Sequence, residues 1–221
     1  MFQNLLRFWQ GKDFLSQVLQ DFKDMLNDTH EMFDQVCDNI IDGSNVEGLK
    51  EKIYCIDRKV NALEKDIRKR IIEHLAMQPS EDVSVSLLLM SVVKDAERLG
   101  DYAKNLFEVK ALINGPLDKN KYNQLFDNLQ GKISDFFNKT EYAFIDSDEE
   151  KAKSAWATER DITKACDNII IKLAGSDFTT NEAVGFALMA RYFKRIAAHL
   201  ANIATSVILP ISDLDYFDEK G

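Results

Sequence analysis

The chain has 221 residues, 45% hydrophobic and 29% charged, a composition typical of a soluble globular protein and not of a disordered or membrane-embedded one. Its 28 basic residues are outnumbered by 37 acidic ones, and a net charge of -9 excludes the basic surface of a typical nucleic-acid-binding protein. With only 3 prolines and 9 glycines, the chain has too few turn residues for an all-β sandwich or barrel.

The cellular location follows from the cysteines and from the absence of targeting segments. Cys37, Cys55 and Cys166 are far apart and form no CxxC motif, as expected in a reducing compartment. No signal peptide is recognisable after Met1, and the longest nearly apolar run, 83–93, is too short to cross a bilayer. The sequence predicts a cytoplasmic protein without a membrane span.

Helical periodicity governs the first half of the chain. Apolar residues recur every three or four positions, and three such stripes predict helices around residues 15–41, 49–75 and 85–106. Ser44 and Glu47 have the spacing of a capping box before the second helix. A clear break follows the third helix at Gly115-Pro116.

The second half repeats this arrangement. Apolar stripes at 122–137, 155–173 and 189–207 predict three further helices. Capping-box spacing occurs again before the last two of them, in Ser147 with Glu150 and in Thr179 with Glu182. Aligned without a gap, segment 97–106 matches segment 194–203, so the chain is a duplicated three-helix unit with a period of roughly a hundred residues.

The predicted fold is therefore all-α, with two tandem three-helix bundles built from six long antiparallel helices. We divide the chain into an N-terminal segment 1–12, a first bundle 13–114, a second bundle 117–210 and an acidic C-terminal tail 211–221.

Two polar pairs have the spacing of a metal site. Glu97 and Asp101 are four residues apart, so their carboxylates lie on one face of the third helix, where they repel unless a cation is bound. Asp57 and Asn61 share this spacing on the second helix, and Glu64 extends the same face. Such ligands suit Mg²⁺, Mn²⁺, Zn²⁺ or iron. The alternative is a solvated face, because a helical wheel places Glu97 and Asp101 opposite the apolar stripe.

Other chemical motifs are absent from the sequence. It contains no phosphate-binding glycine loop, nucleophile elbow or HExxH motif, and no Glu-x-x-His pair for a di-iron centre. We expect His199 to be exposed and without a special role. The basic run 68–70 precedes Glu73 and is expected to form local ion pairs on a solvated face.

One string carries a family resemblance. Glu97-Arg98-Leu99-Gly100-Asp101 resembles the Glu-Arg-Ile-Gly-Asp signature of the PhoU family, and the segments 75–82 and 190–196 are similar to other parts of that family's repeat. The resemblance covers residues 13–209 and implies two tandem three-helix bundles. It also implies a non-enzymatic, cytoplasmic regulator of phosphate transport and phosphate-starvation signalling that works through protein–protein contacts.

The partners implied are a phosphate transporter subunit, a sensor histidine kinase, or both, which would hold the protein at the membrane periphery. We also expect a homodimer and no nucleic-acid partner. Two alternatives remain open: a metal-dependent hydrolase or phosphate-binding helical protein that uses the same carboxylates, and a metal-free helical adaptor.

The resemblance further implies metal clusters, because some family members bind them through Glu/Asp-x-x-x-Asp motifs, one set in each bundle. Carried onto this chain, the first-bundle metal ligands would be Asp57, Asn61, Glu97 and Asp101, with an amide at Asn61 in place of a carboxylate. In the second repeat Lys194 and Ala198 replace the two acids, so we expect no metal there.

Overall fold

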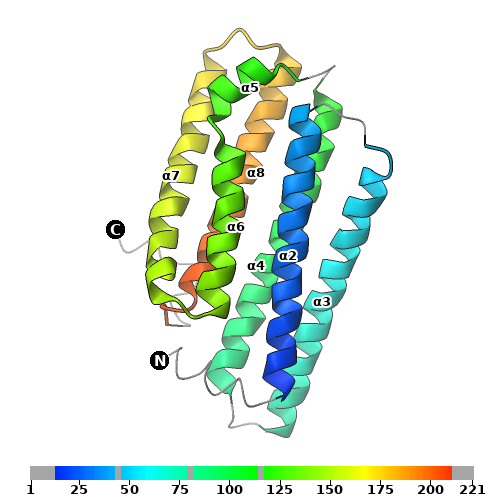
Figure 1. The fold of residues 1–221 in the computed structure, drawn as a ribbon, viewed down its shortest axis with the longest axis vertical. Coiled ribbons are helices and arrows are strands. Elements are labelled where there is room, and N and C mark those ends of the chain that lie inside the picture. The colour runs from blue at the N-terminus through cyan, green and yellow to red at the C-terminus, as the bar shows by residue number, and fades with distance from the viewer. Residues whose placement is uncertain (1–12, 43–45, 79–81, 114–116, 211–221) are drawn as a thin grey trace.

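The computed structural model describes residues 13–42, 46–78, 82–113 and 117–210 (Figure 1). Within these ranges the chain is helical and has no strand, which confirms the all-α prediction. None of the helices described there is long and apolar enough to cross a membrane. The segments 1–12 and 211–221, the Ser44 side of the first capping box and the Gly115-Pro116 break lie outside the described residues.

The helices form two three-helix bundles in chain order (Figure 1). The elements are α2 (Asp13–Asp42), α3 (Leu49–Met77), α4 (Val83–Val109), the 3-10 turn η1 (Lys110–Leu112), α5 (Lys119–Phe126), α6 (Leu129–Ile145), α7 (Glu149–Ala174) and α8 (Thr180–Thr205). The first bundle contains α2, α3 and α4, and the second contains α6, α7 and α8. Between the bundles α4 packs against α8 and α2 packs against α6, so that α3 and α7 lie on opposite outer sides.

The observed N-termini of the helices differ from two of the sequence predictions. Thr179 and Glu182 form the predicted capping box before α8. Before α7, however, the N-cap is Asp148, whose carboxylate accepts hydrogen bonds from two backbone amides, while Ser147 has a left-handed φ of 52° and is one residue too early. Before α3 the N-cap is Gly48, whose φ of 76° suits a residue without a side chain.

The predicted fourth helix is two helices. Asp127 and Asn128 follow one another with positive φ values of 45° and 54°, which end α5 and start α6. Asp and Asn tolerate this left-handed conformation better than other residues with a Cβ atom. The apolar spacing continues across the break, which explains why the sequence pattern predicted one helix: Tyr122 and Phe126 of α5 are still buried.

A row of aromatic rings joins the two bundles. Phe22 of α2 lies 4.8 Å from Phe144 of α6 between ring centroids, and Phe33 of α2 lies 5.6 Å from Phe137 of α6 and 5.7 Å from Phe193 of α8. These rings are at most 3% exposed and belong to one continuous core that runs through both bundles. The duplicated halves therefore share their hydrophobic core.

Polar contacts also cross between the bundles. His199 of α8 places Nδ1 2.7 Å from Oδ1 of Asp95 on α4, and Asn202 donates to the same carboxylate oxygen at 3.2 Å. The imidazole of His30 on α2 lies 2.8 Å from the hydroxyl of Ser134 on α6. The expectation of an exposed His199 without a role was wrong, because α8 faces α4 at this position and the carboxylate is supplied by the other bundle.

Candidate functional site

The predicted metal-ligating residues lie on the facing surfaces of α3 and α4. Asp57, Asn61 and Glu64 occupy successive turns of one face of α3, and Glu97 and Asp101 lie on the α4 side of the same contact. The Asp57, Glu64 and Glu97 residues are 9%, 7% and 8% exposed. The solvated-face alternative was therefore wrong for Glu97: α4 packs against α2, α3 and α8, which leaves it little free surface.

Each of the four carboxylates on this face is paired with a cation, and the charges alternate in sign. We call these eight residues the charge chain. In order, its contacts are Arg68–Glu64 at 3.2 Å, Glu64–Lys94 at 3.8 Å, Lys94–Glu97 at 2.6 Å, Glu97–Arg98 at 3.9 Å, Arg98–Asp101 at 3.0 Å, Asp101–Lys104 at 3.4 Å and Lys104–Asp57 at 2.9 Å. Four positive and four negative side chains leave the charge chain with no net charge.

Two lysines of α4 connect the helices within the charge chain. The ammonium of Lys104 donates to Asp57 on α3 and to Asp101 on its own helix. The ammonium of Lys94 donates to Glu97 and lies near Glu64 on α3. Partial burial lowers the pKa of Lys104, but the carboxylates of Asp57 and Asp101 outweigh it and hold that pKa above its ordinary value. Lys104 is therefore a permanent cation between the two helices.

These contacts bear on the predicted metal site. The oxygen donors are chemically suitable for a hard cation, yet Asp57, Glu97 and Asp101 are already paired with ammonium or guanidinium groups. Among the described residues no group of three or more His, Cys, Asp or Glu side chains could hold a metal ion. Asn61 lies half-buried between Asp57 and Glu64 on the same face. As arranged, this donor set does not fit a metal, and metal binding by the four residues stays a prediction.

The second bundle replaces the corresponding acids as the sequence indicated. Lys194 of α8 contacts both carboxylate oxygens of Asp167 on α7, at 2.8 and 2.9 Å. Glu159 of α7 accepts a hydrogen bond of 2.6 Å from Thr163 on its own helix. In this bundle, too, an ion pair connects two neighbouring helices, α7 and α8.

Sequence reasoning missed the two bridging lysines, although a signal was present. Lys94 precedes Glu97 by three residues and Lys104 follows Asp101 by three, a spacing at which opposite charges meet on a helix. The local ion pairs expected for the basic run 68–70 do form, with Glu64, Glu73 and Asp66 each four residues away. What the spacing could not indicate is that the lysines also reach carboxylates on α3.

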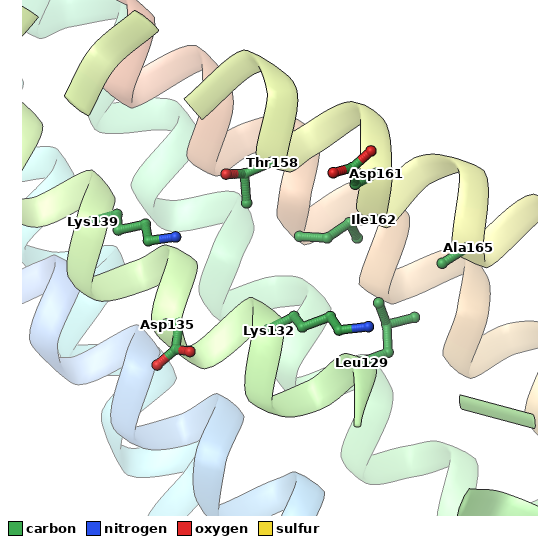
Figure 2. Close-up of a pocket in the computed structure, with 8 residues that line it drawn as sticks. All are labelled: Leu129, Lys132, Asp135, Lys139, Thr158, Asp161, Ile162 and Ala165. Atoms are coloured by element: carbon green, nitrogen blue, oxygen red, sulfur yellow. The ribbon is translucent and has the colours of Figure 1, made fainter. Parts of the chain in front are cut away.

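A shallow groove of about 270 Å³ lies between α6 and α7 (Figure 2). Its lining residues are Leu129, Lys132, Asp135, Lys139, Thr158, Asp161, Ile162 and Ala165. Two lysines and two aspartates balance in charge, and Figure 2 shows that the Asp135 carboxylate points away from α7. Ligand pockets are usually larger than this and mostly apolar, so the groove is a weaker candidate site than the charge chain.

Comparison with known proteins gives a consistent result. The family model described as PhoU domain matches residues 22–109 and again residues 126–207, one copy in each bundle. A curated relative from Clostridium acetobutylicum, named phosphate-specific transport system accessory protein PhoU homolog, is 23% identical over 173 residues, which are 75% of this chain and 78% of the relative.

Two solved structures share the fold. The phosphate transport system regulatory protein PhoU from Streptococcus pneumoniae superposes with a TM-score of 0.76 at 16% identity, covering 94% of this chain and 95% of that one. PhoU from Pseudomonas aeruginosa gives a TM-score of 0.76 at 20% identity, covering 88% and 95%.

Proposed function

The chain belongs to the PhoU family, and from this membership we propose that it regulates phosphate transport and phosphate-starvation signalling through contacts with other proteins, without catalysing a reaction. The observation that carries the proposal is the double match: the family domain fits residues 22–109 and fits again over residues 126–207. The name of the Clostridium acetobutylicum relative, an accessory protein of a phosphate-specific transport system, supports the same role.

The geometry of the α3–α4 face supports a binding protein over a hydrolase. A metal-dependent hydrolase needs an open coordination position and usually a general base. The carboxylates of Glu64, Glu97 and Asp101 are instead each held against a lysine or arginine. Because each of these carboxylates is engaged by a cation of the chain, none of them is open to a substrate or to an attacking water.

The direct test is genetic and biochemical in the native host. Deletion of the gene should uncouple phosphate uptake and phosphate-starvation gene expression from external phosphate, and expression of the wild-type chain should restore the coupling. A tagged chain should co-purify from detergent-solubilised membranes with a phosphate transporter subunit, a sensor histidine kinase, or both. An unaltered phosphate response in the deletion strain would refute the proposal.

A second measurement distinguishes the proposed regulator from the metal-dependent hydrolase. The purified chain is incubated with a chromogenic phosphate ester, with and without added divalent metal, beside Asp101→Asn. We expect no turnover in either protein. Turnover that is lost in Asp101→Asn would instead favour the hydrolase. Light scattering coupled to gel filtration tests the homodimer that is expected from the sequence.

A further inference from the structure

We propose that Lys104 and Lys94 take the positions of metal ions between α3 and α4, so that this face of the first bundle is closed by the protein's own side chains. This inference departs from the metal expected at Asp57, Asn61, Glu97 and Asp101. It concerns how the face is held together, so it does not depend on the proposed regulatory function.

The first support is the geometry of Lys104. A single ammonium lies 2.9 Å from a carboxylate oxygen of Asp57 on α3 and 3.4 Å from one of Asp101 on α4. Joining carboxylates from two neighbouring helices is what a bridging metal ion would do at this place. Arg98 holds the other oxygen of Asp101 at 3.0 Å, so both sides of that carboxylate are satisfied.

The second support is that the arrangement occurs twice along the same contact. Lys94 connects Glu97 on α4 with Glu64 on α3, at 2.6 and 3.8 Å. Glu64 lies seven residues after Asp57, which is two helical turns further along the same face of α3. The two lysines therefore neutralise successive levels of one interface, each from a position three residues away from an acid of α4.

The third support comes from the second bundle. At the position that aligns with Glu97 the chain has Lys194, and this lysine contacts both carboxylate oxygens of Asp167 on α7. In both repeats, therefore, an ion pair between a lysine and a carboxylate joins the second and third helices of the bundle.

To bind here, a metal ion would have to displace the ammonium group of Lys104. Lys104 is attached to the helix and keeps its charge, because the two carboxylates raise its pKa above the ordinary value despite partial burial. A divalent cation beside it would be repelled, and would gain ligands only after the lysine had moved away. Removing the ammonium should therefore create metal affinity that the natural chain lacks.

The test compares the wild-type chain with Lys104→Met, which removes the ammonium and leaves the Asp57 and Asp101 carboxylates directed at one point. Both proteins are purified without a metal-affinity tag and measured by elemental analysis and by thermal unfolding, first with chelator and then with Mn²⁺ or Zn²⁺. We expect no stoichiometric metal in the wild-type chain and a Tm that chelator and added metal leave unchanged. Lys104→Met should have a lower Tm, which rises with metal concentration.

Two further variants control the test. Lys104→Met/Asp57→Asn should lose the response to metal, because one of the two freed carboxylates is gone. Lys59→Met removes a lysine that lies on α3 and outside the charge chain, where it pairs with Asp28 of α2 at 2.8 Å. Its Tm should not respond to metal.

Stoichiometric metal in the wild-type chain that is lost in Asp57→Asn or Asp101→Asn would overturn the inference. A folded Lys104→Met protein whose Tm ignores both metals would also overturn it. If Lys104→Met fails to fold, the metal content of the wild-type chain still tests the inference.

Discussion

Replacing Phe33 with alanine tests whether the two bundles fold as one unit. The Phe33 side chain of α2 is fully buried, and its ring contacts Phe137 and Phe193 of the second bundle. Because the ring is fully buried, the substitution loses the transfer free energy of the removed atoms, about 2–3 kcal/mol. The cavity and the two lost ring contacts increase the expected loss to about 4 kcal/mol, within the range of about 3–5 kcal/mol for such changes.

The assay follows urea unfolding by two probes. Far-UV circular dichroism reports on all helices, whereas Trp156 lies on α7 and reports on the second bundle by fluorescence. The other tryptophan, Trp9, is replaced by phenylalanine in every protein compared, so that the fluorescence comes from Trp156 alone. We expect Phe33→Ala to lower both midpoints equally, since the change in α2 removes packing that the second bundle shares.

The control is Ile171→Ala on α7, where the side chain is 71% exposed and the expected change is within about 0.5 kcal/mol. If Phe33→Ala left the Trp156 midpoint in place while the circular dichroism split into two transitions, the bundles would unfold separately. The argument from a shared core would then be wrong.

Two further predictions concern a helix start and a histidine. Thr179→Ala removes the N-cap side chain of α8 and its hydrogen bonds with Glu182, so it should lower the free energy of unfolding in urea by about 1 kcal/mol. Thr179→Ser keeps the hydroxyl group and should retain most of the stability. Equal losses in the two variants would contradict the capping argument. Burial lowers the pKa of His30 below its ordinary value in spite of three nearby carboxylates, so below a pH of about 6.5 the unfolded chain binds more protons than the folded one. The free energy of unfolding should keep this contribution in full above that pH and lose it as the pH drops towards the folded-state pKa of His30. His30→Gln should flatten this pH dependence. An unchanged slope of unfolding free energy against pH would contradict the assignment to His30.

The sequence predicted the existence of the long helices well because each apolar stripe is local information, whereas only one of the three predicted helix starts was right. Thr179 and Glu182 are three residues apart, and their capping box formed as predicted. The prediction failed where two conformations fit the same local pattern. Asp127 and Asn128 interrupt a stripe whose apolar residues are buried on both sides of the break, so the apolar pattern alone did not show where the helix ends.

The candidate site, too, was predicted only in part. Spacing placed Glu97 with Asp101 and Asp57 with Asn61 on helix faces, and the absence of a metal site in the second repeat stays a prediction. Spacing did not indicate that Lys104 would reach Asp57, because that contact joins residues 47 positions apart and exists only when α4 packs against α3.

The sequence by itself determined that this protein is a duplicated helical chain with acidic residues on one face of each of two helices, since helical periodicity and repeats are properties of neighbouring residues. Tertiary structure alone decided what those acids meet. Packing buried Asp57, Glu64 and Glu97 at the α3–α4 contact, where an unpaired charge is costly. It also placed Lys104 beside Asp57, and Lys94 beside Glu64 and Glu97. The same packing joined Phe33 to two helices of the second bundle and made one core from two similar halves.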